Sequence, residues 1–145
     1  MVELYTDGGC IGNPGPGGWA FVIKDSDFLV EAFGGEKDTT NNRMELTAVT
    51  RGLERAFQEF PGAKIKVITD SQYVKNGITT WIHSWKRNGW RTASKLPVKN
   101  QEFWVALDSV CQKMDLEWGW VKGHSGNPLN ERCDALVHQG IKEIS

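Results

Sequence analysis

Apolar residues change their spacing near Asn42, and this change limits the folds open to the chain. Before it, short runs with the character of strands lie at residues 2–6, 19–24 and 28–33, separated by turn residues. After it, apolar residues recur at helical spacing. Three consecutive strands joined by turns predict an antiparallel meander, followed here by a long helix.

That helix is predicted from Asn42 to the Pro-Gly pair at 61–62, a pair that ends helices. Its buried face should consist of Leu46, Val49, Leu53, Phe57 and Phe60. Further on, strands are expected at 65–69 and 116–121, and helices at 71–78, 80–87, 101–113 and from 127 to the C-terminus. This order predicts an α/β fold with a five-stranded mixed sheet, an antiparallel meander followed by parallel strands. Its ligand should bind beyond the carboxyl ends of the parallel strands.

The composition is that of one ordinary folded domain. With 145 residues, 39% of them hydrophobic and 24% charged, a single domain over 1–145 is expected. The apolar runs are shorter than the roughly 20 residues of a membrane-spanning helix, and the first residues lack the bases of a signal peptide. We therefore expect a cytoplasmic protein with no membrane partner. Three cysteines without paired spacing favour reduced thiols, and nothing in the sequence indicates an obligate protein partner, so a monomer is expected.

The stretch TDGGCIGNPGPGGW, at residues 6–19, places one acid directly before a turn rich in glycine and proline. It lacks the lysine and the helix start of a phosphate-binding loop. A hairpin turn explains the glycines and prolines, but it gives Asp7, which we expect at the end of the first strand, no role. Asp70, in TDSQ, likewise follows a predicted strand, although it or Ser71 could instead cap the next helix.

Two further acids, Glu45 and Asp134, lie on predicted helices. Each is about 70–80° from the centre of its helix's apolar stripe, at the border between core and solvent. Taken singly, such an acid is more often a solvated surface residue than a ligand. If all four acids converge, their carboxylates repel one another and stay ionised only with cations between them. Oxygen ligands select hard ions, Mg²⁺ first and Mn²⁺ as a substitute, and one or two such ions can activate water to hydrolyse a phosphodiester.

Basic residues are concentrated in one part of the chain. The 31 residues between Asp70 and Glu102 contain six bases and no acid, whereas the rest of the chain carries a net charge of −7. Such segregation is typical of a protein with one side that faces a polyanion.

Five segments together resemble the bacterial type 1 ribonucleases H, in order and at matching separations: TDGGCIGNPGPGGW, TTNNRMEL, TDSQYVKNGITTWIHSWKRNGW, PVKN and WVKGHSGNPLNERCDALV. The resemblance runs from about residue 4 to about residue 137. It implies the ribonuclease H-like fold, with helices on both faces of the sheet and a basic handle at about 80–99. It also implies an endonuclease that uses Mg²⁺ to cut the RNA strand of an RNA–DNA hybrid, leaving 5′-phosphate and 3′-hydroxyl ends.

The resemblance assigns roles to particular residues of this chain. The family's metal ligands correspond to Asp7, Glu45, Asp70 and Asp134, and its mobile-loop histidine, an auxiliary group in proton transfer or product release, corresponds to His124. Groups that read the minor groove correspond to Cys10, Asn13, Asn41 and Gln72, and a pocket for a DNA phosphate to Thr40 and Asn100. Asn13 and Asn41 could also serve turns or caps.

The handle would supply the remaining contacts to the hybrid, through Trp81, Trp85, Lys86, Arg87, Trp90, Arg91, Lys95 and Lys99. Its cations would give sequence-independent affinity that falls with salt. Its tryptophans are more often core residues than platforms for stacked bases. Two positions depart from the family, because Gly9 stands where a serine is common and Leu96 replaces a frequent base.

Two other functions are compatible with the sequence. One is a non-catalytic module that binds hybrids or double-stranded RNA through the basic handle alone, against which the retained acids argue. The other is the different nuclease chemistry of transposases, integrases and junction resolvases built on similar folds. TTNNRMEL and the full handle argue against that second alternative.

Overall fold

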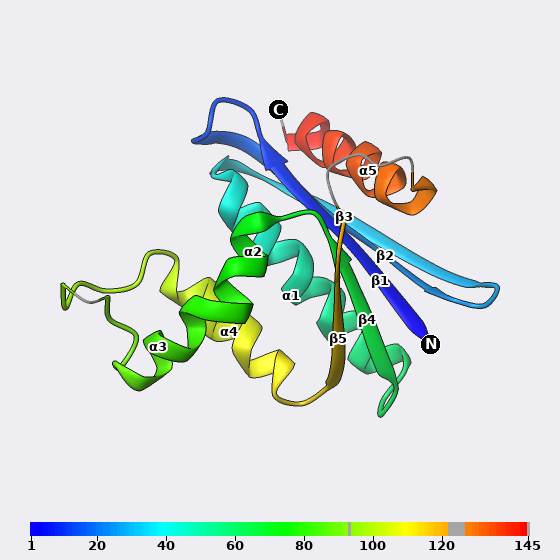
Figure 1. Ribbon diagram of the computed structural model, residues 1–145. Coiled ribbons are helices and arrows are strands. Elements are labelled where there is room, and N and C mark those ends of the chain that lie inside the picture. The colour runs from blue at the N-terminus through cyan, green and yellow to red at the C-terminus, as the bar shows by residue number, and fades with distance from the viewer. Residues whose placement is uncertain (93, 122–126, 145) are drawn as a thin grey trace.

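The computed structural model describes residues 1–92, 94–121 and 127–144. Within these residues, five strands form one mixed sheet in the order β3-β2-β1-β4-β5 (Figure 1). The meander consists of β1 (Val2–Cys10), β2 (Gly15–Asp25) and β3 (Phe28–Thr39), which pair antiparallel. The parallel strands are β4 (Lys64–Thr69), beside β1, and β5 (Asp115–Trp120) at the edge. The predicted fold class is confirmed.

Helices cover both faces of the sheet (Figure 1). One face carries α5 (Pro128–Ile144), which packs on β1, β2 and β3. The other carries α1 (Asn41–Glu59) with α4 (Gln101–Cys111) against it, and beside them α2 (Gln72–Asn76), the π-helical turn η1 (Gly77–Trp81) and α3 (Ile82–Arg87). Because successive strand residues point to opposite faces, two apolar cores form. Leu4 belongs to the core under α1, and Tyr5 belongs to the core under α5.

The strands of the meander are longer than predicted, because glycine-rich segments expected as turns pair within the sheet. β1 continues to Cys10, β2 already begins at Gly15, and β3 reaches Thr39. A Cβ placed on Gly35 of β3 would lie 2.6 Å from the carbonyl oxygen of Gly140 in α5. Glycine in a strand marks such a close approach of another backbone. A prediction based on alternating side chains could not detect these residues as strand.

The buried face of α1 also differs from the predicted one. The helix ends at Glu59, directly before the predicted stop, but Phe57 is 42% exposed. Ala56 is buried in its place, alongside Leu46, Val49 and Leu53, which were predicted correctly. With 3.6 residues per turn, a helix drifts away from a four-residue spacing, so the position three after Leu53 faces the sheet.

The helices predicted at 71–78 and 80–87 form one continuous helical run. The π-helical turn η1 joins α2 to α3. Its first residue, Gly77, is buried directly against the indole of Trp104 in α4, where a Cβ would overlap the ring. The wide turn thus lies where the helical run passes over a large core side chain.

Among the helices of the described residues, none is both long and apolar enough to cross a membrane.

Candidate active site

Asp7 lies inside β1, opposite Ala20 of β2, and the prediction that it ends the strand is wrong. The parallel pairing of β1 with β4 stops earlier, at Tyr5 and Ile68. Continued by two residues, this register brings Asp7 opposite Asp70, the residue directly after β4. Both aspartates therefore stand at the carboxyl end of the parallel part of the sheet, where α/β sheets bind ligands.

The cap of α2 is Ser71 rather than Asp70. Its Oγ accepts a hydrogen bond from the backbone N–H of Val74 at 3.1 Å. This answers the question that the sequence left open, because the helix end is satisfied without the Asp70 carboxylate.

Glu45 reaches the two aspartates from α1. The helix starts beside the sheet with Thr40 as its cap, whose Oγ1 accepts from the N–H of Arg43 at 3.2 Å. One carboxylate oxygen each of Asp7, Glu45 and Asp70 lies within 4.8 Å of the other two. The three acids come from a strand, a helix and the end of a second strand, and only the tertiary fold brings them together.

The environment of Glu45 disfavours its charged form. Burial raises the pKa of Glu45 well above its usual value, and the negative charges of Asp7 and Asp70 raise it further. Its Oε2 is shielded from solvent and has no hydrogen-bond donor within the described part of the chain. A buried oxygen without a partner is costly, and a cation would satisfy it. Three oxygen ligands suit a hard divalent ion.

Asp134 stands on α5, which starts as predicted. Asn127 Oδ1 accepts from the N–H groups of Leu129 and Asn130, at 2.9 and 3.3 Å. Asp134 is half-buried, and its carboxylate lies 3.7 Å from Nε2 of His138, one turn further along α5. It does not belong to the group of three carboxylates within 4.8 Å.

Cys133, beside Asp134, shows that this turn of α5 lies near the acids. Burial raises the pKa of its thiol to about 12, and the charge of Asp7 adds to the shift. His124, the other group expected near the acids, lies outside the described residues.

The family model for RNase H matches residues 1–142. The chain belongs to the ribonuclease H family. It is 54% identical over 143 residues to "Ribonuclease H" of Dechloromonas aromatica, covering 99% of this chain and 95% of the relative. It is 52% identical over 144 residues to "Ribonuclease HI" of Neisseria meningitidis serogroup B, covering 99% of this chain and 97% of the relative. The crystal structure of LC9-RNase H1, a type 1 RNase H, matches with a TM-score of 0.86 at 28% identity, over 99% of this chain and 73% of that one. The resemblance seen in the sequence is confirmed.

In this member of the ribonuclease H family, three predicted groove-reading residues form one hydrogen-bonded unit beside the acids. Asn41 Oδ1 accepts from the backbone N–H of Cys10 at 2.7 Å. Asn13 Oδ1 accepts from the backbone N–H of Asn41 at 3.1 Å and lies 3.5 Å from Cys10 Sγ. The turn after β1 is thereby tied to the first turn of α1. The fourth residue, Gln72, is exposed at the start of α2.

Asn100 and Thr40, the predicted phosphate pocket, meet at Arg43. Asn100 is buried, with a left-handed backbone (φ 60°), and its Oδ1 accepts from Arg43 Nε at 3.1 Å. Its Nδ2 donates to the hydroxyl of Tyr73 at 3.2 Å. Arg43 was not among the predicted site residues. Its position three residues after Thr40 could have indicated that the two residues lie together at the start of the helix. Arg43 ties the two predicted residues together.

The tryptophans of the handle are packed rather than exposed. Trp81, Trp85 and Trp90 are half-buried against the core under α1. The ring of Trp85 lies 5.8 Å from that of Trp81, 6.3 Å from Trp90 and 5.4 Å from Trp104. These tryptophans therefore pack the handle against the core.

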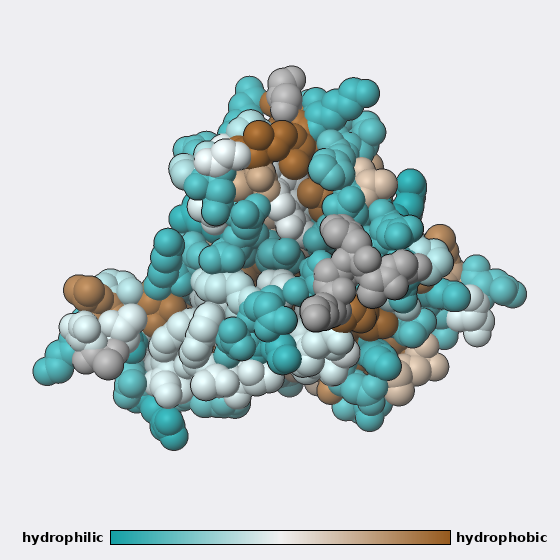
Figure 2. All heavy atoms as spheres, turned by 45° about the horizontal axis from the view of Figure 1, so that its top comes forward, coloured by the Kyte–Doolittle hydropathy of each residue, from teal (hydrophilic) through white to brown (hydrophobic). Residues whose placement is uncertain are grey.

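The cations of the handle are exposed: Lys86, Arg87, Arg91, Lys95 and Lys99. Lys86 is partly neutralised, because its Nζ lies 3.3 Å from Asp108 Oδ1. The handle projects at the left of Figure 1, and Figure 2 brings the upper side of the molecule forward. Hydrophilic and near-neutral residues dominate this side, and hydrophobic residues form separate patches (Figure 2). Such a surface suits a charged, hydrated ligand.

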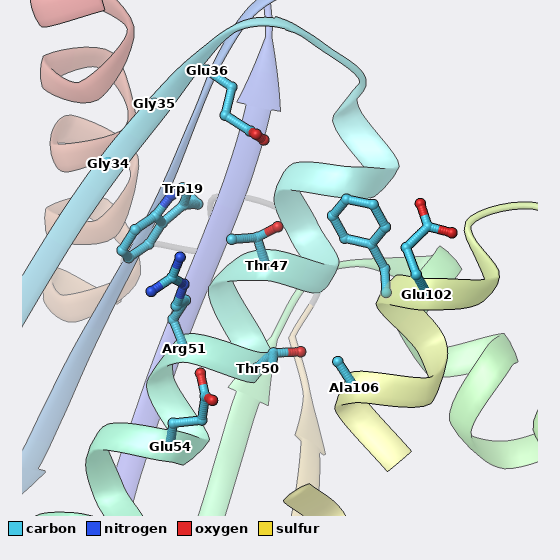
Figure 3. A pocket seen from close by; sticks show the side chains of 11 residues that line it. Trp19, Gly34, Gly35, Glu36, Thr47, Thr50, Arg51, Glu54, Glu102 and Ala106 are labelled. Carbon is cyan, nitrogen blue, oxygen red and sulfur yellow. The ribbon is translucent and has the colours of Figure 1, made fainter. Parts of the chain in front are cut away.

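A cavity of about 610 Å³ lies elsewhere, in a trough across α1 (Figure 3). Of the described residues that line it, none belongs to the four acids. Arg51 lies over the ring of Trp19, 5.7 Å from its centre, between carboxylates that include Glu36, Glu54 and Glu102. Three acids against one base disfavour a phosphate. The lining of the trough therefore does not suit a phosphate.

Proposed function

We propose that this chain hydrolyses phosphodiester bonds in the RNA strand of RNA–DNA hybrids, with Mg²⁺ as cofactor, leaving 5′-phosphate and 3′-hydroxyl ends. One observation carries the proposal. In a member of the ribonuclease H family, Asp7, Glu45 and Asp70 hold carboxylate oxygens within 4.8 Å of one another. Three acids this close favour a bound divalent cation.

We assign metal binding to Asp7, Glu45 and Asp70, with Asp134 approaching from α5. When bound, Mg²⁺ supplies a water of lowered pKa and neutralises charge at the leaving oxygen. The protein must hold these carboxylates ionised, and burial opposes this at Glu45, because it raises the pKa of that residue. Mn²⁺ should substitute, because it accepts the same ligands. One or two ions fit this ligand set.

The neighbouring polar groups would select the substrate. The residues that would read the minor groove flank Asp7, Glu45 and Asp70 in the sequence: Cys10, Asn13, Asn41 and Gln72. In that groove, only the RNA strand carries 2′-hydroxyls. Thr40 and Asn100 would hold a phosphate of the DNA strand. The exposed cations of the handle would bind phosphates without regard to sequence.

His124 keeps its proposed auxiliary role in proton transfer or product release, on the resemblance alone. A cytoplasmic location and a monomeric state are likewise part of the proposal. Gel filtration of the purified protein with light scattering would test the monomer.

The second candidate function is a module that binds hybrids without cutting them. The exposed basic handle favours it, since these cations would bind a duplex with or without a metal site. The convergence of three acids argues against it, because such a cluster repels nucleic acid unless a cation is bound.

One experiment separates these functions. The protein is incubated with a labelled RNA–DNA hybrid, double-stranded RNA and double-stranded DNA, each with Mg²⁺ and with EDTA. We expect cleavage of the RNA strand of the hybrid alone, only with Mg²⁺. Binding without cleavage would establish the module, and efficient cutting of double-stranded DNA would indicate the chemistry of another nuclease class.

A further inference from the structure

We propose that Gly8 is a positioning residue, whose missing side chain lets α1 come close enough to β1 for Glu45 to join Asp7 and Asp70. The inference rests on the proposed metal site and concerns how the fold sets its dimensions. Gly8 directly follows Asp7 in β1 and opposes Trp19 of β2.

The acids approach from opposite sides of the sheet. Leu4 belongs to the core under α1 and Tyr5 to the core under α5. Because strand residues alternate between faces, Asp7 shares the face of Tyr5, and Gly8 shares the face of Leu4. Glu45 belongs to α1, on the face of Gly8. A side chain at position 8 would therefore stand between β1 and the helix that carries Glu45.

The contact at Gly8 is between backbones. A Cβ built on Gly8 would lie 2.6 Å from the backbone nitrogen of Glu45, and closer still to the carbonyl carbon of Met44. Real Cβ atoms essentially never come within 3.0 Å of another heavy atom. Backbone atoms cannot rotate out of the way as a flexible side chain can. Any residue other than glycine must push α1 away from β1 at the turn that bears Glu45.

Hydrogen bonds hold α1 against the strand at the same place. Asn41, one turn before Glu45, accepts from the N–H of Cys10 at 2.7 Å, and its own N–H donates to Asn13 at 3.1 Å. The first turn of α1 is thus bonded to the end of β1 and to the turn after it. Because these bonds hold the turn before Glu45 against the strand, a Cβ at position 8 would displace the next turn, which carries Glu45.

The acid cluster should be sensitive to such a displacement. Mg²⁺ requires near-octahedral geometry with ligands at about 2.0–2.1 Å, whereas larger Ca²⁺ accepts longer and more variable ligand distances. A shift of α1 by several tenths of an ångström would therefore weaken Mg²⁺ binding more than Ca²⁺ binding. A general loss of packing would not discriminate between the two ions.

The chain offers two matched controls. Gly9 is the next residue of β1, but a Cβ there would meet its nearest neighbour, Asn41 Oδ1, at 3.8 Å, which is ordinary contact. Gly52 is buried on α1 two turns beyond Glu45, and its Cβ would meet side-chain carbons of Leu4 at 2.7 and 3.1 Å. Gly52→Ala therefore disturbs the same interface between helix and sheet without touching the turn of Glu45.

The test compares Gly8→Ala, Gly9→Ala and Gly52→Ala with the wild type. Backbone amide NMR follows titrations with Mg²⁺ and Ca²⁺ in the absence of nucleic acid, and urea unfolding in EDTA gives stability. We expect Gly8→Ala to lower Mg²⁺ affinity about tenfold or more, in the range for lost support of a metal ligand, with a smaller effect on Ca²⁺. Gly9→Ala should stay near wild type. Gly52→Ala should lose stability but keep its Mg²⁺ affinity.

Wild-type affinity in folded Gly8→Ala would overturn the proposal, and so would an equal fall in affinity in Gly52→Ala. If Gly8→Ala stays unfolded at 10 °C while Gly52→Ala folds, the close approach serves folding as a whole and the proposal also fails. Cleavage of the hybrid by the wild type is measured first. Its absence would remove the proposed function itself, whereas cleavage by the wild type together with unchanged metal binding in Gly8→Ala removes only the role of Gly8.

Discussion

Asp7 in β1 and Asp70, the residue directly after β4, occupy equivalent positions in one parallel register, 63 residues apart in the sequence. The register that pairs Val2 with Ile65 and Tyr5 with Ile68, carried two residues further, sets the two aspartates opposite each other. This shared position is consistent with the distance between them, because a carboxylate oxygen of each lies within 4.8 Å of one of the other. A one-residue slip of either strand would turn one of them to the opposite face, so this part of the sheet cannot change its register without losing the site.

Replacing Asp70 with Asn should abolish cleavage while the fold remains. The substitution keeps the size of the side chain but removes a ligand charge, and the metal's contribution amounts to several kcal/mol, so the rate should fall roughly 100-fold or more. Single-turnover cleavage of a hybrid with Mg²⁺ measures this. Hybrid binding and circular dichroism serve as controls, and full activity in the variant would contradict the assignment of Asp70.

Glu45→Gln should stabilise the metal-free protein at neutral pH. Because burial and the neighbouring aspartates raise the folded-state pKa of Glu45, its protonated form favours the folded state. That contribution is complete below the unfolded pKa and is lost as the pH rises through the folded pKa. The neutral variant does not lose this contribution, so we expect its free energy of unfolding at neutral pH to exceed that of the wild type by on the order of 1 kcal/mol.

Urea unfolding of wild type and Glu45→Gln in EDTA, from pH 4 to pH 8, tests this expectation. The two stability curves should diverge as the pH rises. Added Mg²⁺ should stabilise the wild type more than the variant, because only the wild type keeps all the ligand charges. Parallel curves would show that Glu45 titrates as it does in the unfolded chain.

The ion pair between α5 and β3 should contribute little stability. Arg132 donates two hydrogen bonds to Glu31, at 2.6 and 2.9 Å, and these lower the pKa of Glu31. Both side chains are partly exposed, so Glu31→Gln should cost less than about 1 kcal/mol at pH 7. A carboxyl group with a lowered folded-state pKa stabilises the folded protein at a pH above its unfolded-state pKa. This stabilisation is lost as the pH falls through the folded-state pKa.

Urea unfolding of wild type and Glu31→Gln at pH 7 and pH 3 measures that difference. It should shrink at the lower pH and in high salt, and cleavage of the hybrid should be unchanged. A cost above 2 kcal/mol would mean that the pair anchors α5 more strongly than an exposed ion pair can.

Arg91→Ala should weaken hybrid binding without changing chemistry. Arg91 is an exposed cation of the handle, and the slope of log affinity against log salt should fall by about 0.7–0.9 for each phosphate that the variant no longer neutralises. Binding measured between 50 and 300 mM NaCl gives this slope. Lys113, an exposed base outside the handle, provides the control: Lys113→Ala should leave the slope unchanged, and an equal effect in both variants would argue against the handle.

Trp85→Ala should destabilise the fold more than it weakens binding per folded molecule. The ring contacts Trp81, Trp90 and Trp104, and truncating a half-buried tryptophan should cost roughly 2–4 kcal/mol. Urea unfolding measures the destabilisation. Trp85→Phe keeps an aromatic ring in the cluster and should retain most of the stability; a strong fall in hybrid affinity in a stably folded Trp85→Phe would instead indicate that Trp85 touches the substrate directly.

The order of strands and helices was predictable from the sequence, because alternating or helical spacing of apolar residues is a local property. So was the cap at Asn127, since a cap needs only a side chain and the next few backbone N–H groups. The sequence left Asp70 and Ser71 as alternative caps of α2, and it did not identify Thr40 as the cap of α1. The four acids could be selected as candidates, and the resemblance identified the family.

The tertiary structure decided the strand lengths, because the glycines of the meander have no side chains to alternate and are specified by the backbones packed on them. It turned Phe57 outward on α1. Above all, it brought Glu45 to Asp7 and Asp70, since the distance between carboxylates depends on strand register and on how closely a helix can lie over Gly8. These are properties of residues far apart in the chain, and local sequence patterns do not contain them.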